Sequence, residues 1–109
     1  MAARLLVEHG LTIRERNVRT PSGEIDIVAA DGDMVVFVEV RTRRAELGDA
    51  ALSLTRAKLR RMRRCALEYC GLHGIDLGSC RIDVVAIDLP GRRPGSREAT
   101  HYTAIEIPD

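Results

Sequence analysis

The spacing of apolar and polar residues predicts seven secondary-structure elements along the 109-residue chain. They are a helix at 2–9, strands at 11–19, 24–30 and 33–41, a helix that begins at residue 56, and strands at 80–88 and 100–107. A helical crossover joins the strand at 33–41 to the strand at 80–88, so these two strands are expected to pair in parallel. The order α-β-β-β-α-β-β therefore predicts an α/β fold in one domain spanning 1–109, with helices flanking a mixed sheet.

Local signals fix several boundaries of these elements. Gly10 is placed to end the first helix, and Thr55 is a suitable N-cap for the helix that follows it. The strand at 11–19 is expected at a sheet edge, 45–54 as an irregular connection and 89–99 as a loop. Along the second helix, the residues at helical spacing on one apolar face are Leu59, Met62, Ala66, Leu67 and Cys70.

The composition excludes several classes of protein. Hydrophobic residues make up 45% of the chain and aromatic residues only 3%, so the core is expected to be aliphatic, without stacking platforms for single-stranded bases. No apolar run approaches the roughly 20 residues of a membrane-spanning helix, and the N-terminus lacks the pattern of a secretory signal. The cysteines (Cys65, Cys70 and Cys80) are odd in number and lack CxxC spacing. They are expected to be small buried hydrophobes in a reducing cytoplasm.

Positive charge is concentrated in one part of the chain. Residues 41–64 hold nine basic residues against two acidic ones, a local charge of +7, although the whole chain carries only +1. This distribution predicts an anionic partner for the segment. Its core, RAKLRRMRR, would contact a phosphate backbone without regard to sequence; the alternative is a solvated helix face.

The hairpin between 23 and 43 places carboxylates close together. If Asp31 and Gly32 form its two-residue loop, Glu24 lies opposite Glu39 and Asp26 lies diagonally from Glu39, with Cβ atoms about 7 Å apart. Glu24, Asp26, Glu39 and Arg41 then share one face of the sheet. Like charges in such positions repel one another, so a compensating partner is expected.

One candidate for that partner is a divalent cation. Mg²⁺ is typically held by one or two carboxylates, a requirement that Asp26 and Glu39 meet. Arg41 would then stabilise a phosphate during attack by water. The simpler alternative is that Arg41 or Arg43 pairs with Glu39. Elsewhere, Asp83 is expected to pair with a nearby arginine, and His73 and His101 to be ordinary surface residues.

Three segments carry a resemblance to a known family: RNVRTPSGEIDIVAADGDMVVFVEVRTR, LTRAKLRRMRRCALEY and RIDVVAI. They resemble the small bacterial proteins of the YraN family, also catalogued as uncharacterised family UPF0102. That family is similar to the PD-(D/E)xK nucleases, and among them to archaeal Holliday-junction resolvases. The resemblance runs from about Ala2 to Ile87 and implies a restriction-endonuclease-like core.

The resemblance also implies roles for individual residues. Asp26 would match the metal-binding aspartate and Glu39 the second acidic ligand. Arg41 would occupy the position of the catalytic lysine; arginine stays protonated, so it would bind phosphate rather than act as a base. Glu24 and Lys58 would support the site. The family's helical Gly-Glu pair, whose glutamate can complete the metal site, has no match in this chain.

The sequence therefore leads to three hypotheses. The first is a cytoplasmic Mg²⁺- or Mn²⁺-dependent endonuclease-like enzyme acting on DNA, with branched DNA as one substrate and a homodimer as the form that resolvase-like activity would need. The second is a nucleic-acid-binding module without catalysis, and the third is an interaction protein whose carboxylates are structural. The residues expected to contact nucleic acid are Arg43, Arg44, Arg56, Lys58, Arg60, Arg61, Arg63 and Arg64.

Overall fold

The computed structural model describes residues 1–44, 54–89 and 98–106. Its elements are α1 (Ala2–Glu8), β1 (Thr12–Thr20), β2 (Gly23–Asp31), β3 (Met34–Arg44), α2 (Arg56–His73), the short 3-10 helix η2 (Leu77–Ser79), β4 (Cys80–Leu89) and β5 (Glu98–Tyr102). The predicted α/β order α-β-β-β-α-β-β is confirmed. The connection expected at 45–54 and the loop expected at 89–99 fall almost wholly outside the described residues.

The sheet has five strands in the order β1-β2-β3-β4-β5. Strand β3 pairs in parallel with β4 from Val35–Cys80 to Arg44–Leu89, and the other neighbouring strands are antiparallel. The predicted parallel pairing and the edge position of β1 are both confirmed. Within the described ranges, no helix is long and apolar enough to cross a membrane.

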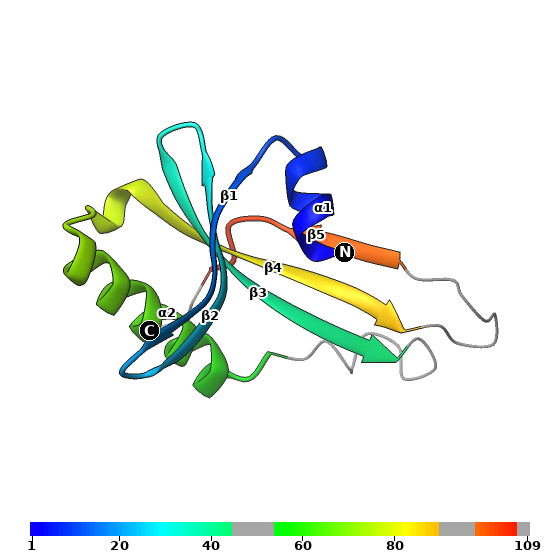
Figure 1. The fold of residues 1–109 in the computed structure, drawn as a ribbon. Coiled ribbons are helices and arrows are strands. Elements are labelled where there is room, and N and C mark those ends of the chain that lie inside the picture. The colour runs from blue at the N-terminus through cyan, green and yellow to red at the C-terminus, as the bar shows by residue number, and fades with distance from the viewer. Residues whose placement is uncertain (45–53, 90–97, 107–109) are drawn as a thin grey trace.

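One helix packs on each face of the sheet, and the two helices lie well apart in Figure 1, with α1 beside β5. The α1 face is built on Leu6, Val36, Val38 and Val85. The α2 face is built on β-strand side chains such as Phe37, packed against residues of the helix. Both clusters are largely aliphatic, as the composition predicts, and the central strands β2 and β3 are covered on both sides.

The buried stripe of α2 differs from the predicted apolar face. Its members follow the spacing i, i+3, i+4, i+7 and i+8: Met62, Cys65, Ala66, Tyr69 and Cys70. The prediction that Leu67 belongs to this face is wrong, because Leu67 lies off the stripe and 42% of it is exposed. The helix begins as expected, with the Thr55 hydroxyl accepting a hydrogen bond from the Lys58 backbone N–H at 3.2 Å. It ends at Gly74, which adopts the left-handed conformation.

The register of the β2–β3 hairpin also differs from the prediction. Asp31 pairs with Met34, so the loop residues are Gly32 and Asp33 rather than Asp31 and Gly32. Gly32 has a φ of 59°, and a glycine at the first loop position is typical of type II′ hairpins. The predicted pairs Glu24–Glu39 and Asp26–Phe37 are therefore wrong. A shift of two positions preserves side-chain alternation, so Phe37 still faces α2.

A buried polar network joins β4 to the C-terminal segment. Asp83 is fully buried, and its carboxylate accepts hydrogen bonds from Arg81 Nε at 3.1 Å and from the Ala104 N–H at 2.9 Å. His101 Nε2 lies 2.8 Å from the same carboxylate, and the His101 side chain is only 1% exposed. The expected Asp83–arginine pair is confirmed. The expectation that His101 lies at the surface is wrong, because the Asp83 carboxylate gives it a buried partner.

Replacement of Asp83 should be strongly destabilising. Asp83→Ala leaves the buried groups of Arg81, His101 and Ala104 without their acceptor, so we expect a loss of about 3–5 kcal/mol in the free energy of unfolding. Urea denaturation followed by circular dichroism would measure it. Glu8→Ala, at an exposed position, is the control and should change stability by less than about 0.5 kcal/mol. A similar small loss for Asp83→Ala would contradict the importance of the network.

Candidate functional site

The site lies where β2 and β3 separate. Their paired register ends at Ile27–Val38, one residue before Asp26 and Glu39 would face each other. Beyond that point, Asp26 Oδ2 accepts a hydrogen bond from the Val40 backbone N–H at 2.7 Å. A side chain thus takes the place of a backbone carbonyl, satisfies the Val40 donor and fixes the Asp26 carboxylate against β3.

The neighbouring strand bends at the same level. Asn17 of β1 has a φ of 54°, an uncommon value for a residue other than glycine. On one side of this point Ile27 packs against the α1 face, and on the other Ile25 packs against the α2 face. The β1–β2 pair therefore turns over at Asn17 and Asp26. Asp26 lines a hollow of about 390 Å³ beside α1, together with Asn17 and Val40.

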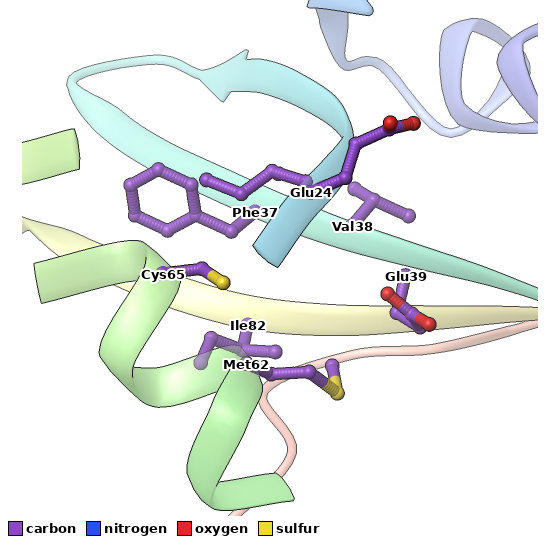
Figure 2. Close-up of a pocket in the computed structure, with 8 residues that line it drawn as sticks. Glu24, Phe37, Val38, Glu39, Met62, Cys65 and Ile82 are labelled. Atoms are coloured by element: carbon purple, nitrogen blue, oxygen red, sulfur yellow. The ribbon is translucent and has the colours of Figure 1, made fainter. Parts of the chain in front are cut away.

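Glu39 is held in a partly apolar environment on the other side of β3. Its side chain is 15% exposed and borders a cavity of about 10 Å³, enough for roughly one water molecule. Phe37, Met62 and Ile82 contribute apolar surface to this cavity (Figure 2). Burial raises the pKa of Glu39, and the neighbouring charge of Asp26 raises it further.

Three cations act in the opposite direction on Glu39. Arg61, Arg41 and Lys58, in decreasing order of effect, lower its pKa, although the net shift remains upward. Arg61 Nη2 lies 4.0 Å from Glu39 Oε1, at the outer limit of an ion pair. The predicted proximity of Arg41 to Glu39 is therefore supported by charge, but the contact at ion-pair distance comes from α2. The side chain of Arg43, the other predicted partner, lies outside the described part of the chain.

The Arg41 side chain is incompletely satisfied. Its Nε is buried, and no hydrogen-bond partner for it is found among the residues that the structure describes. A buried guanidinium N–H without an acceptor is costly, and a phosphate oxygen is a well-suited acceptor for it. Arg41 thus lies within electrostatic range of Glu39, with one buried N–H donor that has no acceptor among the described residues.

Glu24 does not join the carboxylate pair. It lies opposite Arg19 of β1, is exposed, and in Figure 2 its carboxylate points away from that of Glu39. Glu24 still contributes to the wall of the cavity beside Glu39. The two-position register shift explains why the predicted Glu24–Glu39 contact is wrong.

Sequence reasoning placed Arg61 on the basic helix but missed its contact with Glu39. The signal that could have revealed it is Gly23, at the start of the GEIDIV motif. A Cβ at Gly23 would lie 3.4 Å from Cys65 Sγ and 3.5 Å from Arg61 Cδ, so the glycine lets α2 approach β2 closely. This close approach carries the Arg61 side chain toward the carboxylates.

The basic helix presents its charge away from the sheet. Lys58 is partly buried, and five arginines of α2 are exposed: Arg56, Arg60, Arg61, Arg63 and Arg64. Lys58 and Arg61 connect this surface to Glu39 through charge. The side chains of Arg43 and Arg44, the other predicted nucleic-acid contacts, are not described. The structure therefore places Glu39 beside the basic surface of α2, whereas Asp26 lines the hollow beside α1. The prediction that Asp26 and Glu39 share one face of the sheet is wrong, and the two carboxylates interact through charge.

The donors present are compatible with Mg²⁺ or Mn²⁺. Carboxylate oxygens are hard ligands, and Mg²⁺ sites commonly use one or two of them with water completing the shell. Asp26 and Glu39 supply two. Burial raises the pKa of Glu39 most, the charge of Asp26 raises it further, and a bound cation would offset both effects. No cluster of three His, Cys, Asp or Glu residues suited to a metal occurs in the described ranges. Asp26 and Glu39 remain the residues that the sequence predicts would hold the ion.

Fold and site together define a small α/β protein with a five-stranded mixed sheet and a carboxylate pair beside a basic helix. A family model described as "Uncharacterised protein family UPF0102" matches residues 1–87. The chain belongs to this family, as the sequence motifs predict.

Relatives in several bacteria support the assignment. A UPF0102 protein of Moorella thermoacetica is 51% identical over 87 residues, covering 79% of this chain and 72% of that relative. A UPF0102 protein of Kineococcus radiotolerans is 45% identical over 98 residues, covering 88% and 80%. A third, from Shewanella amazonensis, is 47% identical over 87 residues, covering 79% and 80%.

The raised pKa of Glu39 makes a prediction about pH. Between the ordinary pKa of Glu39, 4.5, and its higher pKa in the folded chain, the folded state binds more protons. Stability contributed by Glu39 therefore falls as pH rises through this window. Glu39→Gln removes the charge with little change in shape, so it should gain stability relative to wild type between about pH 4 and neutrality.

Chemical denaturation across this pH range would measure the effect. Glu24→Gln, at an exposed position of the same hairpin, is the matched control and should show a smaller dependence on pH. A Glu39→Gln variant that is less stable than wild type at neutral pH, or offset from it equally at every pH, would refute this assignment of the charge imbalance.

Proposed function

We propose that this protein is a nucleic-acid-binding, metal-dependent endonuclease-like protein that acts on DNA phosphodiesters, with branched DNA as one candidate substrate. The observation that carries the proposal is the environment of Glu39. This largely buried carboxylate lies within the electrostatic influence of Asp26 and of three cations, Arg41, Lys58 and Arg61. Phosphodiester hydrolysis requires such a combination of carboxylates and cations, because negative charge increases on the phosphate during attack.

Each residue has a role in this proposal. Asp26 and Glu39 would hold Mg²⁺ or Mn²⁺, which supplies Lewis-acid polarisation of the phosphate when bound. Arg41 would donate to an oxygen of the scissile phosphate through its guanidinium, whose Nε has no partner among the described residues. Its permanent charge suits it to stabilise the phosphate and not to accept a proton.

The exposed face of α2 would bind the flanking phosphates. Lys58 and Arg61 lie at the end of this face that is coupled to Glu39, so a backbone bound along α2 would reach the carboxylates. Contacts of this kind are independent of sequence and weaken with salt. The resemblance of the family to PD-(D/E)xK nucleases supports the same assignment.

A nucleic-acid-binding module without catalysis is the second candidate. Two observations favour it: arginine occupies the position that the resemblance assigns to a catalytic lysine, and the described residues supply two carboxylates to the site, not three. Such a protein would bind DNA in a salt-dependent manner and leave it intact. An interaction protein, the third candidate, would bind neither metal nor DNA.

The variant that tests the metal site is Asp26→Asn. It retains an oxygen acceptor for the Val40 N–H but removes the charge, so the strand geometry should survive. We expect wild type to bind Mn²⁺ at millimolar concentration or below in calorimetric titration, and the variant to bind at least about tenfold more weakly. Mn²⁺-dependent cleavage of linear, flapped and four-way DNA should be lost in parallel.

Asp33→Asn, in the exposed hairpin loop, is the matched control and should behave as wild type in both assays. No binding of Mn²⁺ by wild type would sink the enzyme hypothesis. Binding without cleavage would select the inactive module, and cleavage that survives both Asp26→Asn and Glu39→Ala would point to a contaminating nuclease.

The nucleic-acid surface has a separate test. Arg60→Ala and Arg64→Ala should each weaken DNA binding and reduce the slope of log K against log salt by about 0.9 for each phosphate that the protein no longer neutralises. Fluorescence anisotropy with a labelled duplex at several salt concentrations would measure the slope. Arg4→Ala, an exposed change on α1, should leave the slope unchanged. Equal effects from Arg4 and the α2 arginines would argue for diffuse attraction instead of a surface on α2.

A further inference from the structure

Two cysteines of the described chain lie close together, away from the carboxylate site. Cys70, in the last turns of α2, and Cys80, the first residue of β4, have Sγ atoms 3.4 Å apart. Cys70 is 4% exposed, whereas Cys80 is partly exposed. A disulfide bond needs about 2.05 Å between the sulfurs, so only a small side-chain movement separates the two thiols from bonding distance.

Backbone contacts hold the two cysteines near each other independently of their sulfurs. The Cys70 carbonyl accepts hydrogen bonds from the N–H groups of Gly74 and Ile75, which close the end of α2. Asp76 caps η2 through its side chain, and its carbonyl lies 3.5 Å from Cys80 Sγ. These hydrogen bonds hold the segment between the two cysteines in a defined turn. The proximity of the Cys70 and Cys80 side chains therefore follows from the backbone conformation.

We propose that Cys70 and Cys80 form a dithiol that a glutathione-type disulfide oxidises to an intramolecular disulfide, which ties the end of α2 to the start of β4. Cys65 does not take part. It is 2% exposed, and its sulfur packs under Gly23 at the opposite side of the helix stripe.

The reaction proceeds through two exchanges. The partly exposed Cys80, as thiolate, attacks one sulfur of glutathione disulfide; the glutathione S–S bond breaks, a mixed disulfide forms and one glutathione thiolate leaves. Cys70, as thiolate, then attacks the Cys80 sulfur, and the second glutathione thiolate leaves. The two protons of the protein thiols end on the two glutathiones. The two electrons that the cysteines lose reduce the oxidant.

The environment of Cys80 sets the pace of the first exchange. Burial raises the pKa of Cys80 to about 12, and the hydrogen bond with Cys70 contributes to the rise. Only the thiolate attacks, so oxidation should be slow at neutral pH. As long as the pH stays below the pKa of Cys80, each increase of one pH unit should accelerate oxidation roughly tenfold. The pair is therefore expected to resist brief oxidation and to respond to sustained oxidation.

The test is incubation of the folded chain with glutathione disulfide at several pH values, followed by alkylation and intact-mass measurement. We expect a product that has lost two hydrogen atoms and carries one alkylated cysteine. Cleavage after Glu68 separates Cys65 from the pair, and cleavage before Asp76 separates Cys70 from Cys80. The fragments containing Cys70 and Cys80 should remain linked until a reductant is added, and Cys65 should be the alkylated residue.

Matched variants complete the test. Cys65→Ser should oxidise as wild type does, whereas Cys70→Ser should stop at a glutathione adduct on Cys80 that persists. Cys70→Ala replaces Cys70→Ser if the serine variant fails to fold, as judged by circular dichroism. A linkage that includes Cys65, a wild type that stops at the adduct, a disulfide between two chains, or no reaction even at high pH would each overturn the proposal.

Discussion

The hydrogen bond from the Val40 N–H to Asp26 is the contact on which the geometry of the site depends. It satisfies a backbone donor at the point where β2 leaves β3, so the sheet can open there without an orphaned polar group. Strand β3 meanwhile continues in parallel register with β4 as far as Arg44. The segment that carries Glu39 and Arg41 is therefore hydrogen-bonded to β4 on one side and no longer paired with β2 on the other. The Asp26 carboxylate is fixed at the point where β2 and β3 separate.

The charge of Glu39, which lies next to this point of separation, is only partly compensated by the surrounding residues. Burial and Asp26 oppose ionisation of Glu39, while Arg61, Arg41 and Lys58 favour it, and the balance leaves the pKa of Glu39 raised. Two of the three cations come from α2. Their position follows from the buried stripe of that helix and from Gly23, whose missing side chain lets the helix approach.

Periodicity predicted the order of elements, the helical crossover predicted the parallel β3–β4 pair, and residue preference predicted the N-cap Thr55. Each of these depends on local pattern or on a short chain of topological rules. Near the loop, the faces of β2 and β3 were predicted correctly although the predicted register was wrong, because a shift of two positions conserves side-chain alternation. The features that sequence missed depend on distant packing. Four such features depend on contacts between segments that no local pattern relates. They are the positive φ of Asn17, the Asp26–Val40 hydrogen bond, the contact of Arg61 with Glu39 and the burial of His101. The pairing of Cys70 with Cys80 is of the same kind.

The two regions of interest share one helix, α2. Helix α2 holds Lys58 and Arg61 near Glu39 at its beginning and Cys70 beside Cys80 near its end. Arg61 and Cys70 are nine residues apart, about 13 Å along a helix axis, and the buried residues between them form one continuous contact with the sheet. Any change that alters how the end of α2 sits on β4 must therefore be absorbed by that contact or passed along the helix. Because Arg61 lies 4.0 Å from Glu39, its attraction for that carboxylate changes gradually with the position of α2. The packing of α2 on the sheet thus sets the distance between Arg61 and Glu39.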